Sequence, residues 1–450
     1  MENNNSLIKY QSASLSRVSK QIEFTNKLLN TQEVQFIIDF FVQNPRFFKE
    51  LITKNYPLND YLIDKYINIE RNWWGYITDN IEINWSISFM EKYRNRLNTS
   101  LFTNIKIPWT EELIDKFKDI WYWRYNGSED ISLSQVISLP WSEELIEKYK
   151  DEWGWEELCY NSGINWTSKL INKYKENWFY EDRNGGINFG ALSYNINLPW
   201  SIEIIDEFKD NWNWCNLSIN PGIPWSINLI EKFENFWEWE YLSSNEYLPF
   251  TKELIEKYED KWNFHLLSKN QTLPWTDYLF LNYIDRWDWE NLSKNVKLNW
   301  SIDLIELCED KWNWVNLSKN TSLPWSNDFI EKYRFELDFE SLSENKGLPW
   351  SIDLIERYKS LFNFDKLSKN QSLPWSIKFI EKYQNDWNWG RIINIESLPW
   401  SIELIKKFKN KWNFNYYSIL WNYGKIWEKA FKLNVNDRII EKVMDKIKNK

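Results

Sequence analysis

Apolar and polar positions along most of the chain follow one pattern that returns every 25 residues. From Trp200 to Trp400 an aromatic residue stands at this interval, each time just before a Ser or Thr, and Phe250 is the one exception to Trp. With this aromatic as position 0, the unit reads W-S-x-x-L-I-E-K-Y-x-D-x-W-x-W-x-x-L-S-x-N-x-x-L-P, and other positions are named by their offset. A fixed period of this length predicts a repeat architecture.

Each unit contains two helix signals. Apolar residues at +4, +5, +8 and +12 fall on one helical face, and the Ser or Thr at +1 is placed to cap that helix. The second signal begins with an Asn or Asp at +13, such as Asn313, followed by Trp314 and Leu317 three residues apart. It predicts a helix of about two turns that ends near the Asn at +20. The Pro at +24 then ends the connection.

Polar positions in the unit also recur. Glu and Lys at +6 and +7, such as Glu231 and Lys232, point away from the apolar face, and we expect them to pair within their own helices. The Asn at +20 has two interpretations. It lines a ligand groove, or it is structural, capping a helix end in the left-handed region or bonding to the next loop. The structural interpretation is favoured.

A single pair of short helices cannot bury Trp on several faces, whereas stacked neighbours can. The pattern therefore predicts an all-α, helical-repeat solenoid of about fifteen short helix-turn-helix units with caps at both ends. The alternative is a leucine-rich-repeat-like α/β horseshoe, because W-x-W-x-x-L-S-x-N-x-x-L partly matches that motif.

Three segments follow from this pattern. Residues 1–31 do not fit the unit and are predicted to be an N-terminal cap or a docking segment. Residues 32–426 form the repeat array. Residues 427–450 are predicted to be a C-terminal capping helix, with Asp437 as its N-cap and Ile439 and Val443 on its apolar face.

Composition narrows the function. The chain has 33 Trp among 450 residues and a formal net charge of −10, with no basic stripe, so nucleic acid is a poor candidate partner. Three cysteines are too few for a disulfide framework and fit a reducing compartment. There is no signal-peptide pattern and no run of apolar residues long enough to span a membrane, so we expect a cytoplasmic protein with no membrane partner.

Catalytic and metal-binding patterns are missing. The single histidine, His265, has no Cys or second His near it in the sequence, and there is no phosphate-binding glycine loop. We therefore expect a non-enzyme with no catalytic residues, no cofactor and no metal.

Departures from the regular unit mark the candidate binding residues. Two repeats are longer than 25 residues, and the extra segments, 124–132 and 181–191, both enter between the second Trp and the Leu-Ser, which predicts the same edge of the array. They form a binding edge, or they are neutral lengthenings of surface loops, and both interpretations stay open. Two leucines replace charged residues at outward positions of neighbouring repeats. They form an apolar contact spot, or they reflect local repacking of the helices, and local repacking is favoured. The candidate residues are Arg124, Tyr125, Glu129, Asp130, Glu181, Asp182, Arg183, Leu281 and Leu307.

The first functional hypothesis is a non-catalytic scaffold that binds another protein or a peptide through the solenoid surface and the two insertions. A second is glycan or single-stranded nucleic-acid binding by exposed Trp side chains. A third is an enzyme with an acidic site in the insertions. The identity of the partner and the oligomeric state do not follow from the residues.

The composite unit LPWSIDLIEKYEDKWNWENLSKN resembles the Trp-rich tandem repeats of about 25 residues in uncharacterised bacterial and viral proteins. The resemblance covers roughly residues 58–420. It implies a repeat type and supplies no site residues.

Overall fold

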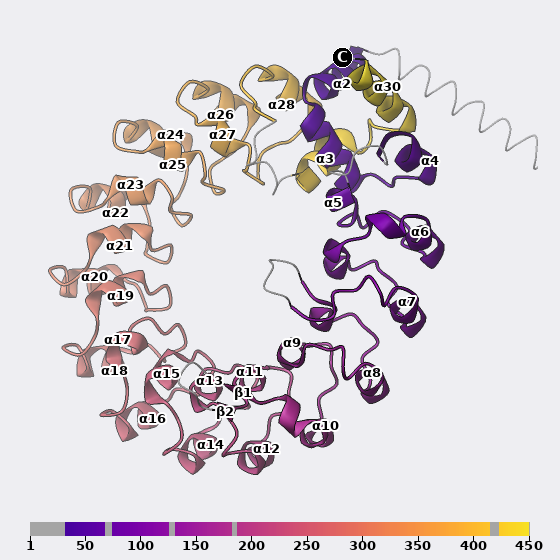
Figure 1. The fold of residues 1–450 in the computed structure, drawn as a ribbon. Helices are drawn as coiled ribbons and strands as arrows, with labels where there is room; N and C mark the ends of the chain where they lie inside the picture. The colour runs from indigo at the N-terminus through magenta and orange to yellow at the C-terminus, as the bar shows by residue number, and fades with distance from the viewer. Residues whose placement is uncertain (1–31, 68–73, 126–130, 182–186, 415–422, 450) are drawn as a thin grey trace, which may run out of the picture. The chain divides into compact units, whose positions relative to one another are not determined.

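The computed structural model describes residues 32–67, 74–125, 131–181, 187–414 and 423–449. The chain divides into two compact units (Figure 1). Unit 1 comprises Met1–Asn84, Lys92–Leu97 and Asn388–Lys450, and unit 2 comprises Trp85–Glu91 and Asn98–Trp387. The predicted segment 1–31 lies outside the described residues.

Unit 2 is a succession of short helices in the predicted rhythm of two per repeat. The first helices are α7 (Glu111–Lys116), α8 (Glu143–Lys148), α10 (Ser168–Lys173), α12 (Ile202–Glu207), α14 (Ile227–Lys232), α16 (Lys252–Lys257), α18 (Asp277–Asn282), α20 (Ile302–Leu307), α22 (Asn327–Lys332), α24 (Ile352–Arg357) and α26 (Ile377–Lys382). The second helices are α9 (Trp155–Cys159), α11 (Gly190–Ser193), α13 (Trp214–Ser218), α15 (Trp239–Ser244), α17 (Phe264–Leu267), α19 (Trp289–Lys294), α21 (Trp314–Lys319), α23 (Phe339–Leu342) and α25 (Phe364–Leu367).

The remaining elements of unit 2 are short. They are the 3₁₀ helices η4 (Thr99–Thr103), η5 (Leu133–Gln135) and η6 (Lys175–Asn177), and the strands β1 (Tyr180–Glu181) and β2 (Ile187–Asn188), which pair antiparallel. Helix α6 (Ile87–Lys92) has its residues divided between the two units. In the described residues, the segment that a leucine-rich repeat would place in a strand is helical, so that alternative is not supported.

Capping explains where the helices begin. In the first helices the +1 hydroxyl accepts a hydrogen bond from the backbone N–H at +4, as Ser226 does from Leu229 at 3.2 Å. In most second helices, those of unit 2 that begin after Asn or Asp, the +13 side chain does the same, as Asn313 does from the N–H of Asn316 at 3.0 Å. Both predictions are confirmed. The second helices run four to six residues, shorter than the two turns predicted.

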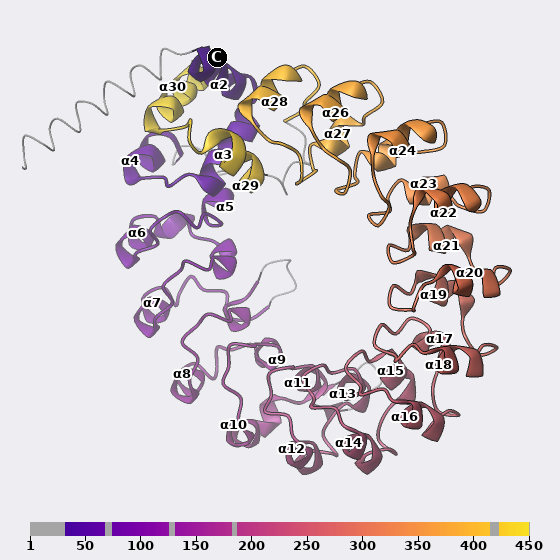
Figure 2. The ribbon, with the colours of Figure 1, turned by 180° about the vertical axis from the view of Figure 1, so that it is seen from behind.

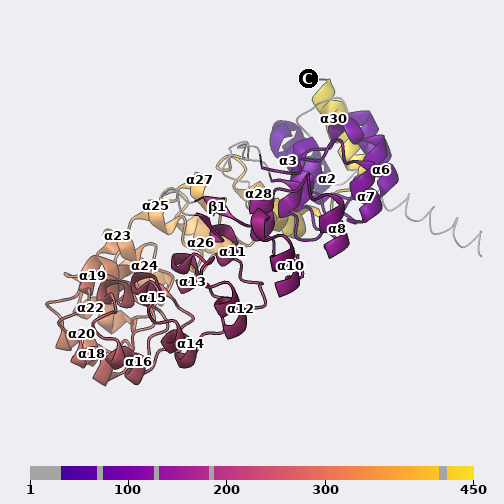
Figure 3. The ribbon, with the colours of Figure 1, turned by 60° about the horizontal axis from the view of Figure 1, so that its bottom comes forward.

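The helices of unit 2 form two rows. Successive second helices contact one another, for example α13 with α15 and α21 with α23. The first helices form the other row, which runs alongside the row of second helices in the front and back views (Figures 1 and 2). Figure 3 shows the same two rows from a tilted direction.

Unit 1 joins the two ends of the described chain. Its elements are α2 (Gln32–Gln43), α3 (Pro45–Asn55), α4 (Asp60–Leu62), η1 (Ile63–Ile67), α5 (Trp74–Ile77), η3 (Arg94–Arg96), α27 (Trp389–Ile392), α28 (Ile402–Lys407), α29 (Tyr423–Ile426), η8 (Trp427–Phe431) and α30 (Asp437–Lys448). Helices α2 and α30 lie side by side (Figures 1 and 2).

An aromatic core holds unit 1 together. The Phe41 ring lies 4.8 Å from the Phe431 ring, and the Phe47 ring lies 4.7 Å from the Phe414 ring. The buried Glu50 carboxylate accepts hydrogen bonds from the hydroxyls of Tyr76 and Tyr423. The N-terminal helices and the C-terminal helices therefore share one core.

The C-terminal segment differs from its prediction in two respects. Residues 427–450 are not one helix, because η8 and α30 are separate elements. The N-cap of α30 is Asn436, one residue before the predicted Asp437, and its side chain accepts the N–H of Ile439. Ile439 and Val443 are buried, as the apolar face predicted. None of the helices in the described residues combines the length and apolar character needed to cross a membrane.

Candidate binding surface

Tryptophan rings fill the interfaces between neighbouring repeats. Trp239, at +14, lies 4.6 Å from the Tyr258 ring and 4.9 Å from the Trp262 ring of the next repeat, and the two Trp rings meet edge to face. Within a repeat, the ring at 0 meets the ring at +12, as Trp225 does Trp237 at 4.9 Å. The Trp225 and Trp237 rings are tilted to each other by 53°, and the edge-to-face contact of Trp239 with Trp262 is a favoured packing of aromatic rings. The three Trp positions therefore belong to the core of the array.

The exposure of the Trp side chains agrees with this role. Among the described residues every Trp is buried or half-buried, and none is exposed. Several indole N–H groups also donate to backbone carbonyls, as Trp237 does to Ile230 at 3.2 Å and Trp325 does to Asn320 at 2.8 Å. An indole that is packed and hydrogen-bonded inside the chain offers little surface for stacking a sugar or a base.

The Asn at +20 forms a ladder that ties each repeat to the one before it. The Asn320 side-chain amide donates to the carbonyls of Ser293 and Asn295 in the preceding repeat, both at 3.1 Å, and its Oδ1 accepts the N–H of Ser322 at 2.9 Å. Equivalent bonds to the preceding repeat are made at Asn220, Asn245, Asn270, Asn295, Asn345 and Asn370.

This ladder decides between the two interpretations of the Asn. Asn320 is only 3% exposed, and both ends of its amide are occupied by protein groups, so it is structural and does not line a groove. Its φ of −72° and ψ of 119° are extended, so the predicted left-handed cap is wrong. Its Oδ1 accepts the N–H of Ser322 in the loop that follows, so the predicted bond to the next loop is confirmed. The amide bonds to the preceding repeat were not predicted.

A second ladder runs through the Ser at +18. The Ser318 hydroxyl donates to the carbonyl of Trp314 at 2.7 Å and accepts the N–H of Asp338 in the next repeat at 2.9 Å. The same pair of bonds is present at Ser218, Ser243, Ser268, Ser293 and Ser343. A single hydroxyl therefore satisfies a helix carbonyl and the backbone N–H at +13 of the next repeat, just before that repeat's second helix.

Charged residues of the first helices bridge neighbouring repeats. Lys257 pairs with Glu231 of the preceding repeat at 2.6 Å, and Lys382 pairs with Glu356 at 3.0 Å. Pairing within each helix was the prediction. It is wrong for this ladder, because the lysine at +7 faces the acid at +6 of its neighbour.

Tyrosine joins this charged ladder at +8. The Tyr174 hydroxyl donates to Glu147 of the preceding repeat, and Lys173 pairs with the same carboxylate at 3.0 Å. The hydrogen bond from Tyr174, followed by the lysine contacts, lowers the pKa of Glu147 to about 2. The carboxylate is therefore ionised over the whole physiological range.

The first insertion is attached to the next repeat at its base. The Arg124 guanidinium donates to the carbonyls of Asp151 and Glu152, the latter at 2.8 Å, and the Tyr125 N–H donates to Glu157. The predicted site residues Glu129 and Asp130 lie outside the described residues. Arg124 thus has a structural role at the base of the insertion, while the Tyr125 ring is 54% exposed.

The second insertion enters at a different point from the one predicted. The Ser193 hydroxyl donates to the Phe189 carbonyl and accepts the N–H of Asn213, so Ser193 is +18 and Phe189 is +14. The extra residues are therefore 180–188, before the +14 aromatic. The predicted end at Ala191 is wrong, because Ala191 belongs to α11.

The two insertions therefore lie on either side of one repeat position. Trp123 holds +14 in the first case, because its ring packs 4.9 Å from Trp153 and its carbonyl accepts from Ser134, and the extra residues follow it. In the second case they precede Phe189. Glu181 lies in β1, and Asp182 and Arg183 lie outside the described residues.

The two leucines are exposed as predicted. Leu281 on α18 is 49% exposed and Leu307 on α20 is 64% exposed. Both are predicted site residues that lie on first helices of regular repeats, outside the insertions. Sequence reasoning overlooked Tyr278, which is also on α18 and is 46% exposed.

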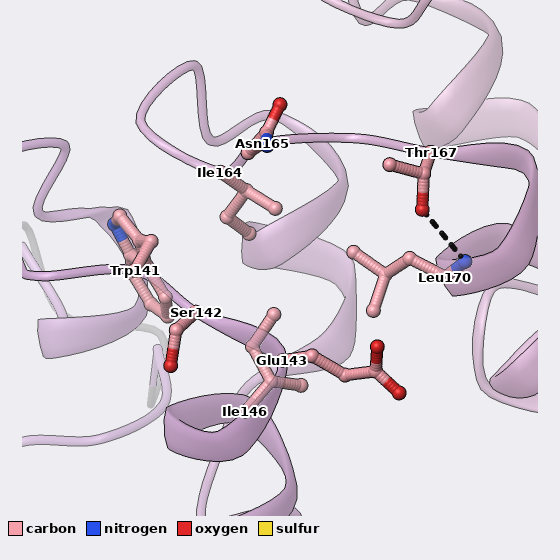
Figure 4. A pocket seen from close by; sticks show the side chains of 8 residues that line it. All are labelled: Trp141, Ser142, Glu143, Ile146, Ile164, Asn165, Thr167 and Leu170. Carbon is pink, nitrogen blue, oxygen red and sulfur yellow. Dashed lines mark hydrogen bonds between the residues drawn. The ribbon is translucent and has the colours of Figure 1, made fainter.

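A pocket of about 280 Å³ lies between the repeats of Trp141 and Trp166 (Figure 4). Ile146, Ile164 and Leu170 line its apolar part. The Glu143 carboxylate at its side pairs with Lys169 and Lys173, both at 3.0 Å, and so offers no free charge. The pocket is a gap between two repeats and brings no reactive groups together.

The single histidine has an acidic neighbour and no metal partners. His265 contacts the carboxylate of Asp288, which also caps α19 by accepting the N–H of Asn291 at 2.9 Å. No group of His, Cys, Asp and Glu in the described residues is arranged to hold a metal ion.

No protein-family model matches the chain, and comparisons with curated proteins and with solved structures give no match either. The resemblance of the unit to Trp-rich tandem repeats therefore stays a prediction.

Proposed function

We propose that the chain is a non-catalytic scaffold that binds another protein or a peptide through the outward side chains of repeats stacked as a helical solenoid. The observation that supports this proposal is the contrast between a constant buried frame and variable exposed positions. Positions 0, +12, +18 and +20 hold neighbouring repeats together by the contacts described above. Such nearest-neighbour stacking is how solenoids build an extended binding surface.

The exposed positions differ from repeat to repeat. At +15, five successive repeats carry Cys215, Glu240, His265, Glu290 and Val315. All but the half-buried Cys215 are exposed. A fixed frame with changing surface chemistry fits recognition of one irregular protein surface better than binding of a uniform polymer.

The glycan and nucleic-acid alternative has less support. It requires exposed Trp, and the described Trp side chains are buried or half-buried. The net charge of −10 also opposes a phosphate backbone. We place the scaffold in the cytoplasm, because Cys159, Cys215 and Cys308 are free thiols, as in proteins of reducing compartments.

The two insertions extend the proposed surface, because both emerge beside the +14 aromatic. They can be removed without disturbing the frame. Deleting residues 125–131 leaves Arg124 and Ser132 as the two residues between Trp123 and Leu133, and deleting residues 180–188 joins Phe179 to Phe189. Each deletion restores a repeat of 25 residues.

A peptide-display selection on the immobilised full chain tests the proposal. We expect enriched peptides to share a sequence pattern and to bind the native chain saturably, with weaker binding to the double-deletion chain. Single-stranded DNA and a glycan panel should show no saturable binding. Selection without a shared pattern, or equal binding to an unrelated helical-repeat protein, contradicts the proposal.

A further inference from the structure

The charged ladder of the first helices has a rule. The lysine at +7 of one repeat bonds the acid at +6 of the preceding repeat, and it also bonds the residue at +2 where that residue is an acid. Lys148 does so with Glu111 and Asp115, at 2.5 and 2.7 Å. Lys173 contacts Glu143 and Glu147 in the same way, both at 3.0 Å.

One step of the array replaces this pair of charges with a pair of leucines. Leu281 occupies +6 in the repeat of Trp275, and Leu307 occupies +7 in the repeat of Trp300. They are 26 residues apart, the same separation as Glu231 and Lys257, which pair at 2.6 Å. The two positions that carry an ion pair in other repeats therefore carry two exposed apolar side chains here. Leu281 is 49% exposed and Leu307 is 64% exposed.

The acid at +2 of this pair of repeats has no lysine at +7 of the next repeat to bond. Asp277 holds the +2 position, and in the described part of the chain no ion pair involves it. Its counterpart Glu111 has Lys148 as its partner. A cation is thus missing beside the two leucines, at a position where other repeats provide one.

The surroundings are acidic. Residues 276–287 and 301–311, the first helices and turns of these two repeats, contain six acids and two basic residues. The two basic residues lie against aromatic rings at the starts of second helices, Arg286 at 3.9 Å from Phe264 and Lys311 at 5.2 Å from Trp289. Two of the acids are paired, Asp285 with Lys311 at 3.9 Å and Glu306 with Lys332 of the next repeat. The six acids are Asp277, Asp285, Asp303, Glu306, Glu309 and Asp310.

We propose that Leu281, Leu307 and Asp277 form a docking point for a segment of a partner protein that presents an aliphatic side chain beside a Lys or Arg. The exposed leucines would be buried against the aliphatic side chain. The cation would take the place of the missing ladder lysine beside Asp277. The acidic surroundings disfavour an anionic membrane or a nucleic acid. This inference rests on the proposed scaffold function and names the partner chemistry.

The chain offers a variant that repairs the ladder. L281E/L307K introduces the residues that other repeats carry at these positions and leaves the net charge unchanged. It should fold as the wild type does, because the same pair is already present between α14 and α16. The matched control is Ile227→Ser on α14, which removes an apolar side chain that is 39% exposed in a repeat with an intact ladder.

The probe is a fluorescein-labelled synthetic peptide made only of Leu and Lys with an amphipathic spacing, titrated into the full chain. We expect L281E/L307K to weaken its binding about tenfold or more and Asp277→Asn to weaken it several-fold. Ile227→Ser should not change it. A peptide of the same spacing made of Leu and Glu should not bind.

Unchanged binding of the Leu/Lys peptide to L281E/L307K overturns the inference, as does equal binding of the Leu/Glu peptide. Self-association of the chain that is lost in L281E/L307K, measured by light scattering, also overturns it, because the occupant is then a second copy. If display-selected peptides bind L281E/L307K as tightly as the wild type, the docking point fails while the scaffold function stands.

Discussion

At the residue scale, a few buried polar side chains determine how neighbouring repeats fit together. Asn320 and Ser318 satisfy backbone groups of two repeats at once. The recurrence of these residues was visible in the sequence. The direction of their bonds was not, because a period of 25 residues says which positions matter and not which neighbour they face. The exposure of Leu281 and Leu307 was predictable, since both stand where Glu and Lys point outward elsewhere.

Replacing one Asn at +20 should destabilise both its own repeat and the preceding one. Asn320→Ala leaves the carbonyls of Ser293 and Asn295 without a donor in a buried place, at a cost of roughly 2–4 kcal/mol. Urea unfolding and amide hydrogen exchange should show the loss around residues 293–325. The exposed Lys319 gives the control, and Lys319→Ala should change stability little. Equal effects of the two substitutions would show that the ladder does not hold the repeats together.

At the element scale, local signals were reliable and longer-range ones were not. Capping residues gave the helix starts, because a cap acts within three residues of the helix it begins. The point at which the second insertion enters could not be predicted. The repeat that contains it has no Trp at +14, and only the bonds of Ser193 show that Phe189 takes that position. The pairing of first helices across repeats was likewise hidden, because Glu and Lys also suit pairing within a helix.

The charged ladder predicts that stability depends on pH in the acid range. The pKa of Glu147 is lowered from 4.5 to about 2 in the folded chain, chiefly by the Tyr174 hydrogen bond. A carboxyl whose folded pKa is depressed stabilises the fold above its unfolded pKa, and this contribution is lost as pH falls from about 4.5 towards 2. Glu147→Gln should therefore be less stable than the wild type at pH 7.

The difference between Glu147→Gln and the wild type should shrink as pH falls through that window and should also shrink in high salt. Urea midpoints of both chains at several pH values measure it. Glu152→Gln is a control, since Glu152 is an exposed acid outside this ladder. A stability difference that stays constant from pH 7 to pH 2 would rule out the ladder as its cause.

At the scale of the whole molecule, the sequence predicted a helical repeat array with capped ends and the structure added how the ends are built. Phe41 near the start of the described chain and Phe431 near its end share one core. No periodic signal links them, because the contact lies outside the repeat and joins residues almost four hundred positions apart. The candidate surface was predictable only in part, since several of its residues belong to the insertions, where the repeat pattern gives no guidance.

In the proposed scaffold, Trp holds the repeats together and leaves binding to the variable surface. Iodide quenching of Trp fluorescence in the intact chain, compared with the urea-unfolded chain, measures how far the Trp side chains are shielded from solvent. We expect a blue-shifted emission and quenching far weaker than in the unfolded chain, because each described Trp is buried or half-buried. Quenching close to that of the unfolded chain would show that the Trp side chains are exposed, and Trp packing would then not be what holds the repeats together.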